Sequence, residues 1–357
     1  MHRRHFLSLS AALAALPSGA AWAEVGRPDY LTAANDADNA TYLLGLTRSG
    51  EVRFALPIPA RGHAAAAHPT RAEAVAFSRR PGRYATVIDC AQGREIARLE
   101  SPEGRHFYGH GAYTADGAFL LTTENDFETP AGVLSVYDVA AGYRRIDELP
   151  SGGIGPHEII RLASGGFAVA NGGIQTHPSN DRARLNLPTM RPNLTWLDAD
   201  GAITDQTAPP DAQRLNSIRH IAAAPDGTIV AALQWQGYPL DRVPLMARIT
   251  AGGISYHDHP DTARLKNYGG SVAVSADGGT IAVTGPKGGH VIYFDGATGA
   301  PNGSEALDLA SGAAPDGQSG IVLTCADGLA HRGAASGATR LDVVDGGWVF
   351  DNHLVPV

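Results

Sequence analysis

A short turn that recurs along the chain constrains the fold more than any other feature. Turns of the Asp-Gly or Gly-Gly type separate pairs of runs rich in β-branched residues, at 115–117, 164–166, 225–227, 276–278 and 315–317. Asp-Gly between apolar runs is a hairpin signal, because both residues tolerate a positive φ. The turns recur about every 40–60 residues. Three to four strands per repeat at this spacing predict the blades of a β-propeller.

The repeats predict one all-β domain over residues 24–357, a seven-bladed β-propeller of the YVTN or WD40-like type. The innermost strands of six blades are expected to begin near His63, His110, His157, His220, Ser271 and Ala310. The termini share the seventh blade: "HLVPV" at 353–357 provides its innermost strand, and the runs 30–34, 41–47 and 51–57 provide the others. Such closure leaves no open sheet edge.

The first 23 residues are predicted to be a signal peptide. Arg3 and Arg4 precede an apolar run over 9–16, and Ala21-Trp22-Ala23 has the pattern of a cleavage site. The arginine pair before Phe6 and Leu7 favours the twin-arginine route, and a Sec signal is the alternative. We therefore expect a periplasmic protein.

Charge and composition exclude some partners. The chain has 36 acidic and 28 basic residues, a net charge of −8, so it offers no basic face for nucleic acid. No apolar run after the N-terminus reaches the roughly 18–20 residues that span a bilayer. We expect a monomer. The blade register places Cys90 and Cys325 on opposite faces, so we expect two thiols and no disulfide.

Five of the 14 histidines share one register, the start of an innermost strand: His63, His110, His157, His220 and His353. These strands line the central channel of a propeller, so the five rings are expected to converge at its top rim. Neutral imidazole is a ligand for iron, copper, nickel and zinc. A single histidine is more often a structural residue that bonds nearby backbone. Convergence of five favours a transition-metal site, with iron preferred and copper as the alternative.

Polar residues at the ends of the second strands are expected near the same rim. They include Glu124 beside His110, followed by Asn125, and also Asn171 and Gln234. Glu158 follows His157 and is expected on the other side of its strand. These five residues are predicted to help bind the cofactor, because carboxylates and amides orient imidazole ligands. A solvated turn is the alternative for Glu124 and Asn125. Cys325 is either a soft ligand or a small buried residue.

Several motifs resemble one uncharacterised family, among them "RHFYGHGAYTADG", "TTENDF", "GIGPHEI", "VANGGIQTHP", "SIRHIAAAPDGT" and "GGSVAVSADG". It comprises twin-arginine-exported YVTN-type propellers encoded beside imelysin-type, iron-regulated periplasmic proteins. The resemblance covers nearly the whole mature chain. It implies a role in iron acquisition or handling with an imelysin-type partner, and it implies no particular reaction.

Three kinds of function stay open. The first is a periplasmic metal-binding protein. The second is a metal- or cofactor-dependent enzyme in the same funnel, an oxidoreductase or a lactonase-like hydrolase with Glu124 as the candidate base. This reading rests partly on analogy with other propellers. The third is an interaction scaffold whose histidines are structural.

Overall fold

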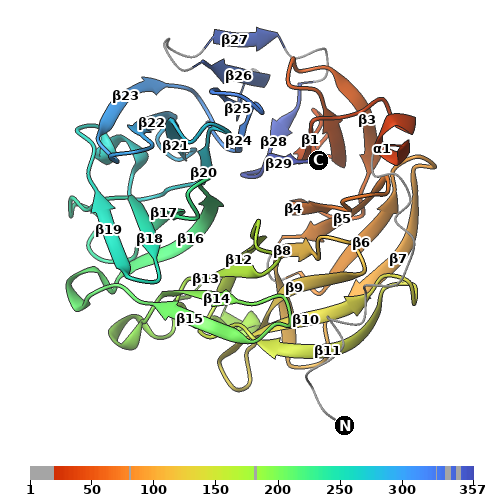
Figure 1. Ribbon diagram of the computed structural model, residues 1–357, viewed down its shortest axis with the longest axis horizontal. Coiled ribbons are helices and arrows are strands. Elements are labelled where there is room, and N and C mark those ends of the chain that lie inside the picture. Colours follow the sequence, from red (N-terminus) through yellow and green to blue (C-terminus); the bar gives the residue numbers. More distant parts are fainter. Residues whose placement is uncertain (1–19, 80–81, 181–182, 327, 334–338, 343–346) are drawn as a thin grey trace.

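The computed structural model describes residues 20–79, 82–180, 183–326, 328–333, 339–342 and 347–357. Seven antiparallel sheets stand in a ring around a central axis (Figure 1). We number these blades 1 to 7 in chain order. The predicted seven-bladed β-propeller is confirmed. Within the described residues, no helix has the length and apolar character needed to cross a bilayer.

Blades 2 to 4 each run from the axis outward in chain order. Blade 2 contains β4 (Gly62–Ala67), β5 (Glu73–Ser78), β6 (Tyr84–Asp89) and β7 (Arg94–Glu100). Blade 3 contains β8 (Arg105–Tyr113), β9 (Phe119–Asp126), β10 (Ala131–Asp138) and β11 (Arg144–Pro150). Blade 4 contains β12 (Pro156–Arg161), β13 (Phe167–Asn171), β14 (Asn193–Leu197) and β15 (Ile203–Thr207).

Blades 5 to 7 repeat this arrangement. Blade 5 contains β16 (Asn216–Ala223), β17 (Ile229–Trp235), β18 (Met246–Thr250) and β19 (Gly253–His257). Blade 6 contains β20 (Ser271–Val274), β21 (Thr280–Gly285), β22 (His290–Asp295) and β23 (Pro301–Ala306). Blade 7 contains β24 (Ala313–Pro315), β25 (Ile321–Cys325), β26 (Gly328–Arg332) and β27 (Thr339–Asp342).

Blade 1 joins the two ends of the chain. It contains β1 (Tyr30–Asn35), β2 (Thr41–Leu46) and β3 (Val52–Pro57), and β1 pairs on its inner edge with β28 (Val349–Phe350) and β29 (Val355–Pro356). The predicted closure is therefore correct, with one refinement. The C-terminal partner is two short strands, and His353 lies in the segment between them.

The helices are short. Helix α1 (Ala20–Glu24) precedes blade 1, and its Trp22 is buried and donates a hydrogen bond from Nε1 to the carbonyl of His68 at 3.0 Å. The 3₁₀ turns are η2 (Pro178–Asn180), η3 (Leu187–Thr189), η4 (Asp211–Gln213) and η5 (Thr262–Leu265). Most of the predicted signal peptide lies outside the described residues.

Burial explains why the sequence forms these strands. The middle strands β21 and β25 are buried at every position, because neighbouring blades pack on both of their faces. The outermost strands β3 and β11 alternate between half-buried and exposed positions, as expected for strands with one wet face. The five predicted turn glycines all have a positive φ, between 71° and 90°. Local sequence and packing thus specify the same fold.

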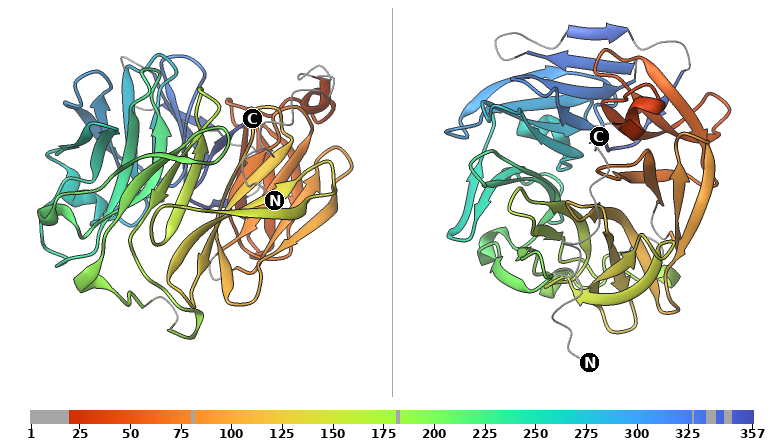
Figure 2. Two further views of the ribbon diagram at one scale, coloured as in Figure 1. Left: turned by 60° about the horizontal axis from the view of Figure 1, so that its bottom comes forward. Right: turned by 45° about the vertical axis from the view of Figure 1, so that its right-hand side comes forward.

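The inner strands all run in one direction along the axis, so the ring has two different faces (Figure 2). We call the end where these strands begin the histidine face and the other end the channel face. Cys90 follows β6, a third strand, and lies toward the channel face. Cys325 ends β25, a second strand, and lies toward the histidine face. Both are buried thiols, as predicted.

Candidate metal centre

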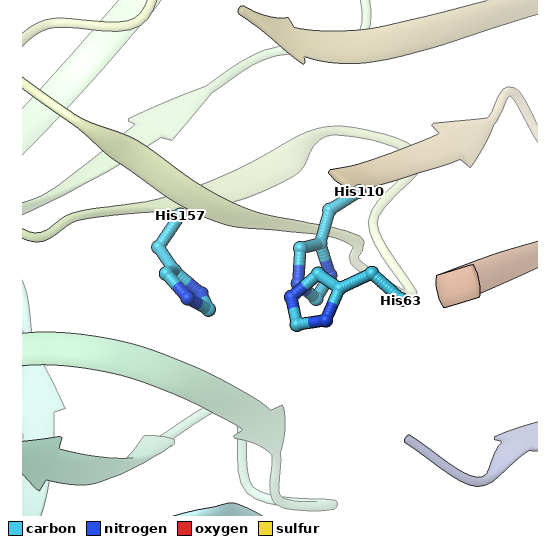
Figure 3. Close-up of side chains that lie close together, drawn as sticks. All are labelled: His63, His110 and His157. Carbon is cyan, nitrogen blue, oxygen red and sulfur yellow. The ribbon is translucent and has the colours of Figure 1, made fainter. Parts of the chain in front are cut away.

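Five buried or half-buried histidine rings meet on the propeller axis. His353 lies 4.6 Å from His63, 4.5 Å from His110 and 4.8 Å from His220, between ring centroids. His157 lies 4.6 Å from His220 and 5.2 Å from His110. Figure 3 shows three of these rings pointing toward one another. The structure therefore brings together all five histidines that share the sequence register, and we call them the histidine centre.

β-Bulges place these rings. The pairing of β4 with β5 slips between Gly62 and Ala65, and that of β8 with β9 slips between Phe107 and Gly111. Similar slips occur at Pro156/Glu158 in β12 and at Ile218/His220 in β16. A bulge bends its strand and re-aims side chains. Each of the four inner strands that carries a histidine is bulged at or beside that histidine.

The rings lie farther along two strands than expected. His63 and His157 are the second residues of β4 and β12, as the register predicted. His110 is the sixth of nine residues in β8, and His220 is the fifth of eight in β16. The reason is that β8 and β16 begin earlier and extend toward the histidine face. Gly109 has a φ of 101°, and a Cβ there would lie 2.5 Å from Cδ2 of His63.

Burial favours the uncharged form of four imidazoles of the centre. It lowers the pKa of His110, His157 and His353 well below the usual histidine value, and the neighbouring imidazoles lower it further. Burial also lowers the pKa of His63, although a hydrogen bond to Asp351 opposes the shift. Neutral rings have a nitrogen lone pair available for a metal ion.

Four of the rings have a buried nitrogen with no hydrogen-bond partner: Nε2 of His110, Nδ1 of His157, Nδ1 of His220 and Nε2 of His353. Leaving a buried polar atom unsatisfied costs about 1–3 kcal/mol. Three sets of side chains each have their ligand atoms within 4.8 Å of one another: His63–His110–His157, His110–His220–His353 and His63–Asp351–His353. The coordinating nitrogens of two imidazoles on one ion are at most about 4.2 Å apart. Small rotations of the rings would therefore bring the three ligand atoms of such a set within reach of one ion.

Asp351 is a member of the centre that the sequence prediction missed. Its Oδ1 accepts a hydrogen bond from Nδ1 of His63 at 3.2 Å, and its Oδ2 accepts one from Arg79 at 2.8 Å. Burial works to raise the pKa of Asp351, but the bond from His63 and the charge of Arg79 outweigh it and lower the pKa. Because Asp351 is an acceptor, His63 carries its proton on Nδ1 and directs the lone pair of Nε2 away. The signal was present in the sequence, since Asp351 lies two residues before His353.

Glu158 lies between two rings of the centre. Its Oε1 is 3.6 Å from Nδ1 of His110, and its Oε2 is 3.6 Å from Nδ1 of His220. The amide of Ile221 also donates to Oε2, at 2.7 Å. We expected Glu158 on the other side of the strand from His157. That orientation is wrong, because the bulge at His157 breaks the alternation and both residues face the axis.

Glu124 does not lie beside His110. It pairs opposite Phe107 within blade 3, is fully buried, and contacts Thr122 and Ser135. Burial raises the pKa of its carboxyl group. The expected position is wrong because β8 begins at Arg105 and is bulged between Phe107 and Gly111, so Phe107 rather than His110 lies opposite Glu124.

The three predicted amides bond to residues outside the centre. Asn125 donates to the carbonyl of Thr176 and contacts Nε2 of His106, a histidine outside the centre. The amide of Asn171 bonds to Ser151, in the connection from blade 3, and to Asn193 in β14. Gln234 donates to the carbonyl of Gly269. These amides connect adjacent blades, and the hydrogen-bond partners named here are all outside the histidine centre.

A channel of about 440 Å³ extends from the centre toward the channel face. It follows the inner strands, and its wall consists largely of alanine, valine and isoleucine. His110, His220, His353 and Glu158 form its inner end, and the C-terminal Val357 contributes to its wall.

A family model described as "Protein of unknown function (DUF1513)" matches residues 56–357. The match covers most of the chain, and it includes all five histidines and Asp351. The chain belongs to this family. A search of curated proteins found no match to the DUF1513 chain.

Solved structures share the fold of the DUF1513 chain. Hydrazine synthase of Kuenenia stuttgartiensis has a TM-score of 0.64 at 12% identity, over 86% of this chain and 93% of that one. The Cps50 (Swd1) β-propeller domain of Myceliophteria thermophila has 0.59 at 11%, over 85% and 93%. A functionally unknown protein from Desulfotomaculum acetoxidans has 0.53 at 13%, over 91% and 99%. At this identity the DUF1513 chain shares only its propeller fold with them.

Proposed function

We propose that this propeller is a periplasmic metal-binding protein that holds one transition-metal ion in the histidine centre. The ligands are drawn from His63, His110, His157, His220 and His353, with Glu158 and Asp351 as the adjacent carboxylates. Export by the twin-arginine route, a monomeric state and a role in iron handling with an imelysin-type partner belong to the same proposal, on the strength of the N-terminal pattern and the family resemblance.

The observation that carries the proposal is the set of four buried imidazole nitrogens without hydrogen-bond partners. A purely structural histidine cluster would be expected to satisfy these atoms with backbone or side-chain partners. Here the rings face one another, and the described residues supply no hydrogen-bond partner for these nitrogens. The donor set therefore fits a metal ion.

The carboxylates favour iron over copper in this proposal. Imidazole binds iron, copper, nickel and zinc, whereas a nearby carboxylate suits harder ions and reduces the net charge of a bound cation. Glu158 lies 3.6 Å from two rings, and Asp351 hydrogen-bonds a third. An ion held here would be retained or would exchange electrons. The hydrolase alternative loses its candidate base, because Glu124 is inside blade 3.

Metal content of single variants tests the proposal. The protein is purified from the periplasm without chelator or an affinity histidine tag, and bound iron and copper are measured by mass spectrometry. Changing His110, His157 or His220 singly to Ala should reduce bound metal at least tenfold, because each removal leaves a weaker and less complete ligand set.

His257→Ala is the matched control, since His257 ends the outer strand β19 far from the axis. It should retain wild-type metal content. Unchanged metal content in all three centre variants, each with a normal circular dichroism spectrum, would refute the metal site and leave a structural histidine cluster.

A further inference from the structure

The five histidines are not equivalent with respect to the channel. His110, His220 and His353 line its inner end, whereas His63 and His157 do not contribute to its wall. The same three residues form one of the sets whose ligand atoms lie within 4.8 Å of one another. Each also has a buried nitrogen with no hydrogen-bond partner. A donor set of three imidazoles therefore borders a cavity of about 440 Å³.

The opposite side of the centre is occupied by other contacts. Asp351 accepts a hydrogen bond from Nδ1 of His63 and another from Arg79. Arg61 lies 3.5 Å from the same carboxylate. These ion pairs occupy that side of the centre. Among the described residues, the open space beside the three imidazoles is the channel. Three protein ligands with one side open is the arrangement in which a metal ion accepts an external ligand.

We infer that the centre binds, from the channel side, a small molecule with an apolar body and one neutral nitrogen or oxygen donor. This inference rests on the proposed function, because the donor atom completes the ligand set of the ion held by His110, His220 and His353.

The channel wall selects the apolar body. Its volume is in the range of small-molecule sites, and its sides are formed by residues such as Ala112, Ala222 and Val272. Ala112 and Ala222 line the channel two residues beyond His110 and His220 on the same inner strands. A ligand bound at the imidazoles would extend across these alanines.

Glu158 selects the neutral donor. Its carboxylate is the acidic group at the inner end of the channel, 3.6 Å from His110 and His220. The carboxylate offsets part of the attraction that a bound cation exerts on an anionic donor, whereas an N–H or O–H group could donate to the carboxylate while its neighbouring lone pair faced the ion. Amines, azoles and alcohols meet this requirement.

Two probes distinguish an open ligand position from a channel. Protein loaded with Co²⁺ is titrated with imidazole and with 4-phenylimidazole, and binding is followed by the visible absorption of the cobalt. Burial of the phenyl group should make 4-phenylimidazole bind about 10–100-fold tighter than imidazole. Equal or weaker affinity for 4-phenylimidazole in the wild-type protein would overturn the inference.

Channel variants test where the phenyl group lies. Ala222→Phe fills the channel beside His220 and should reduce the ratio of the two affinities at least tenfold, with cobalt content and imidazole affinity little changed. Ala222→Leu, a smaller insertion, should reduce the ratio less and serves if the phenylalanine variant does not fold. Ala140→Phe, at an exposed position between β10 and β11, should behave as wild type.

The outcomes separate the two proposals. A protein that retains no metal refutes the proposed function, and the ligand site with it. A protein that retains cobalt but whose affinity ratio is the same in the wild type, Ala222→Phe and Ala222→Leu refutes only the channel site. If Ala140→Phe also lost the preference for 4-phenylimidazole over imidazole, the inference would be overturned, because the effect would not come from the channel.

Discussion

Asp351 and His63 are hydrogen-bonded across 3.2 Å although 288 residues separate them in the sequence. The bond connects the C-terminal segment of blade 1 to the inner strand of blade 2. It also fixes the tautomer of His63, since an acceptor at Nδ1 leaves the lone pair on Nε2. Asp351 is thus the residue that orients one imidazole of the centre.

Asp351→Asn should therefore weaken metal binding about 10–100-fold, the usual effect of removing a carboxylate that orients a histidine ligand. Asparagine keeps the size of the side chain but removes the charge that Arg79 and His63 share. The measurement is competition with a chelator of known affinity. Asp316→Asn is the matched control, because Asp316 forms a comparable pair with His331 at 2.8 Å in blade 7. Equal losses in both variants would contradict the orienting role.

Deletion of residues 353–357 should lower the free energy of unfolding by at least about 3 kcal/mol. The deletion removes the pairing of Leu31 with Val355 and the buried side chain of Leu354, and loss of a buried leucine alone costs about 2–5 kcal/mol. Urea unfolding measures the change. His353→Ala separates the ring from the strand, and it should cost less stability than the deletion. Unchanged stability of the truncated protein would refute closure by the C-terminal segment.

The two thiols should react slowly in the native protein. Cys90 and Cys325 are both buried, and burial raises the pKa of Cys90 to about 12, so very little thiolate forms at neutral pH. Titration with a thiol reagent without reductant should detect two thiols per chain after denaturation and fewer than one within minutes before it. Detection of no thiol in the denatured, unreduced protein would indicate a disulfide and contradict the blade register.

His68 should make the fold sensitive to acid. Burial and nearby Arg71 lower the pKa of His68 to about 4. The unfolded chain, with a histidine pKa near 6.5, then binds more protons than the folded protein. The contribution of His68 to the free energy of unfolding is therefore complete above about pH 6.5. It is lost as the pH falls toward 4, and the loss is at most about 3 kcal/mol.

His68→Asn tests this dependence. In the wild type, Nδ1 of His68 accepts hydrogen bonds from the amides of Thr70 and Arg71, and the asparagine oxygen can take over both. Urea unfolding at a series of pH values should give a flatter curve for the variant between pH 6.5 and 4. Parallel curves for the two proteins would show that His68 does not titrate in this way.

The sequence predicts the ring and the meeting of the histidines because both follow from a long repeat. Turn glycines at regular spacing define hairpins, and a shared offset from those turns places His110, His157 and His220 at one level. The closure by residues 353–357 follows from the need to complete the last blade. These features depend on the period of the pattern rather than on any single contact.

The neighbours of the histidines could not be predicted in the same way. Each bulge adds residues to one strand and reverses the alternation of side chains beyond it, so Glu158 faces the axis where alternation alone places it outside. Glu124 was misplaced because β8 begins before His110 and its bulge puts Phe107 opposite Glu124. Asp351 was missed although it lies two residues before His353, because its hydrogen-bond partner His63 is 288 residues away and no local pattern connects Asp351 with His63.

Blade 1 also links metal binding to closure of the ring. Thr32 in β1 donates a hydrogen bond to the carbonyl of His353 at 2.7 Å, and His353 lies between β28 and β29, which both pair with β1. The ring of His353 therefore reaches the axis only when this segment is paired with the N-terminal strand. An ion bound through this imidazole would connect the two parts of blade 1, so release of the ion and opening of the ring would be coupled.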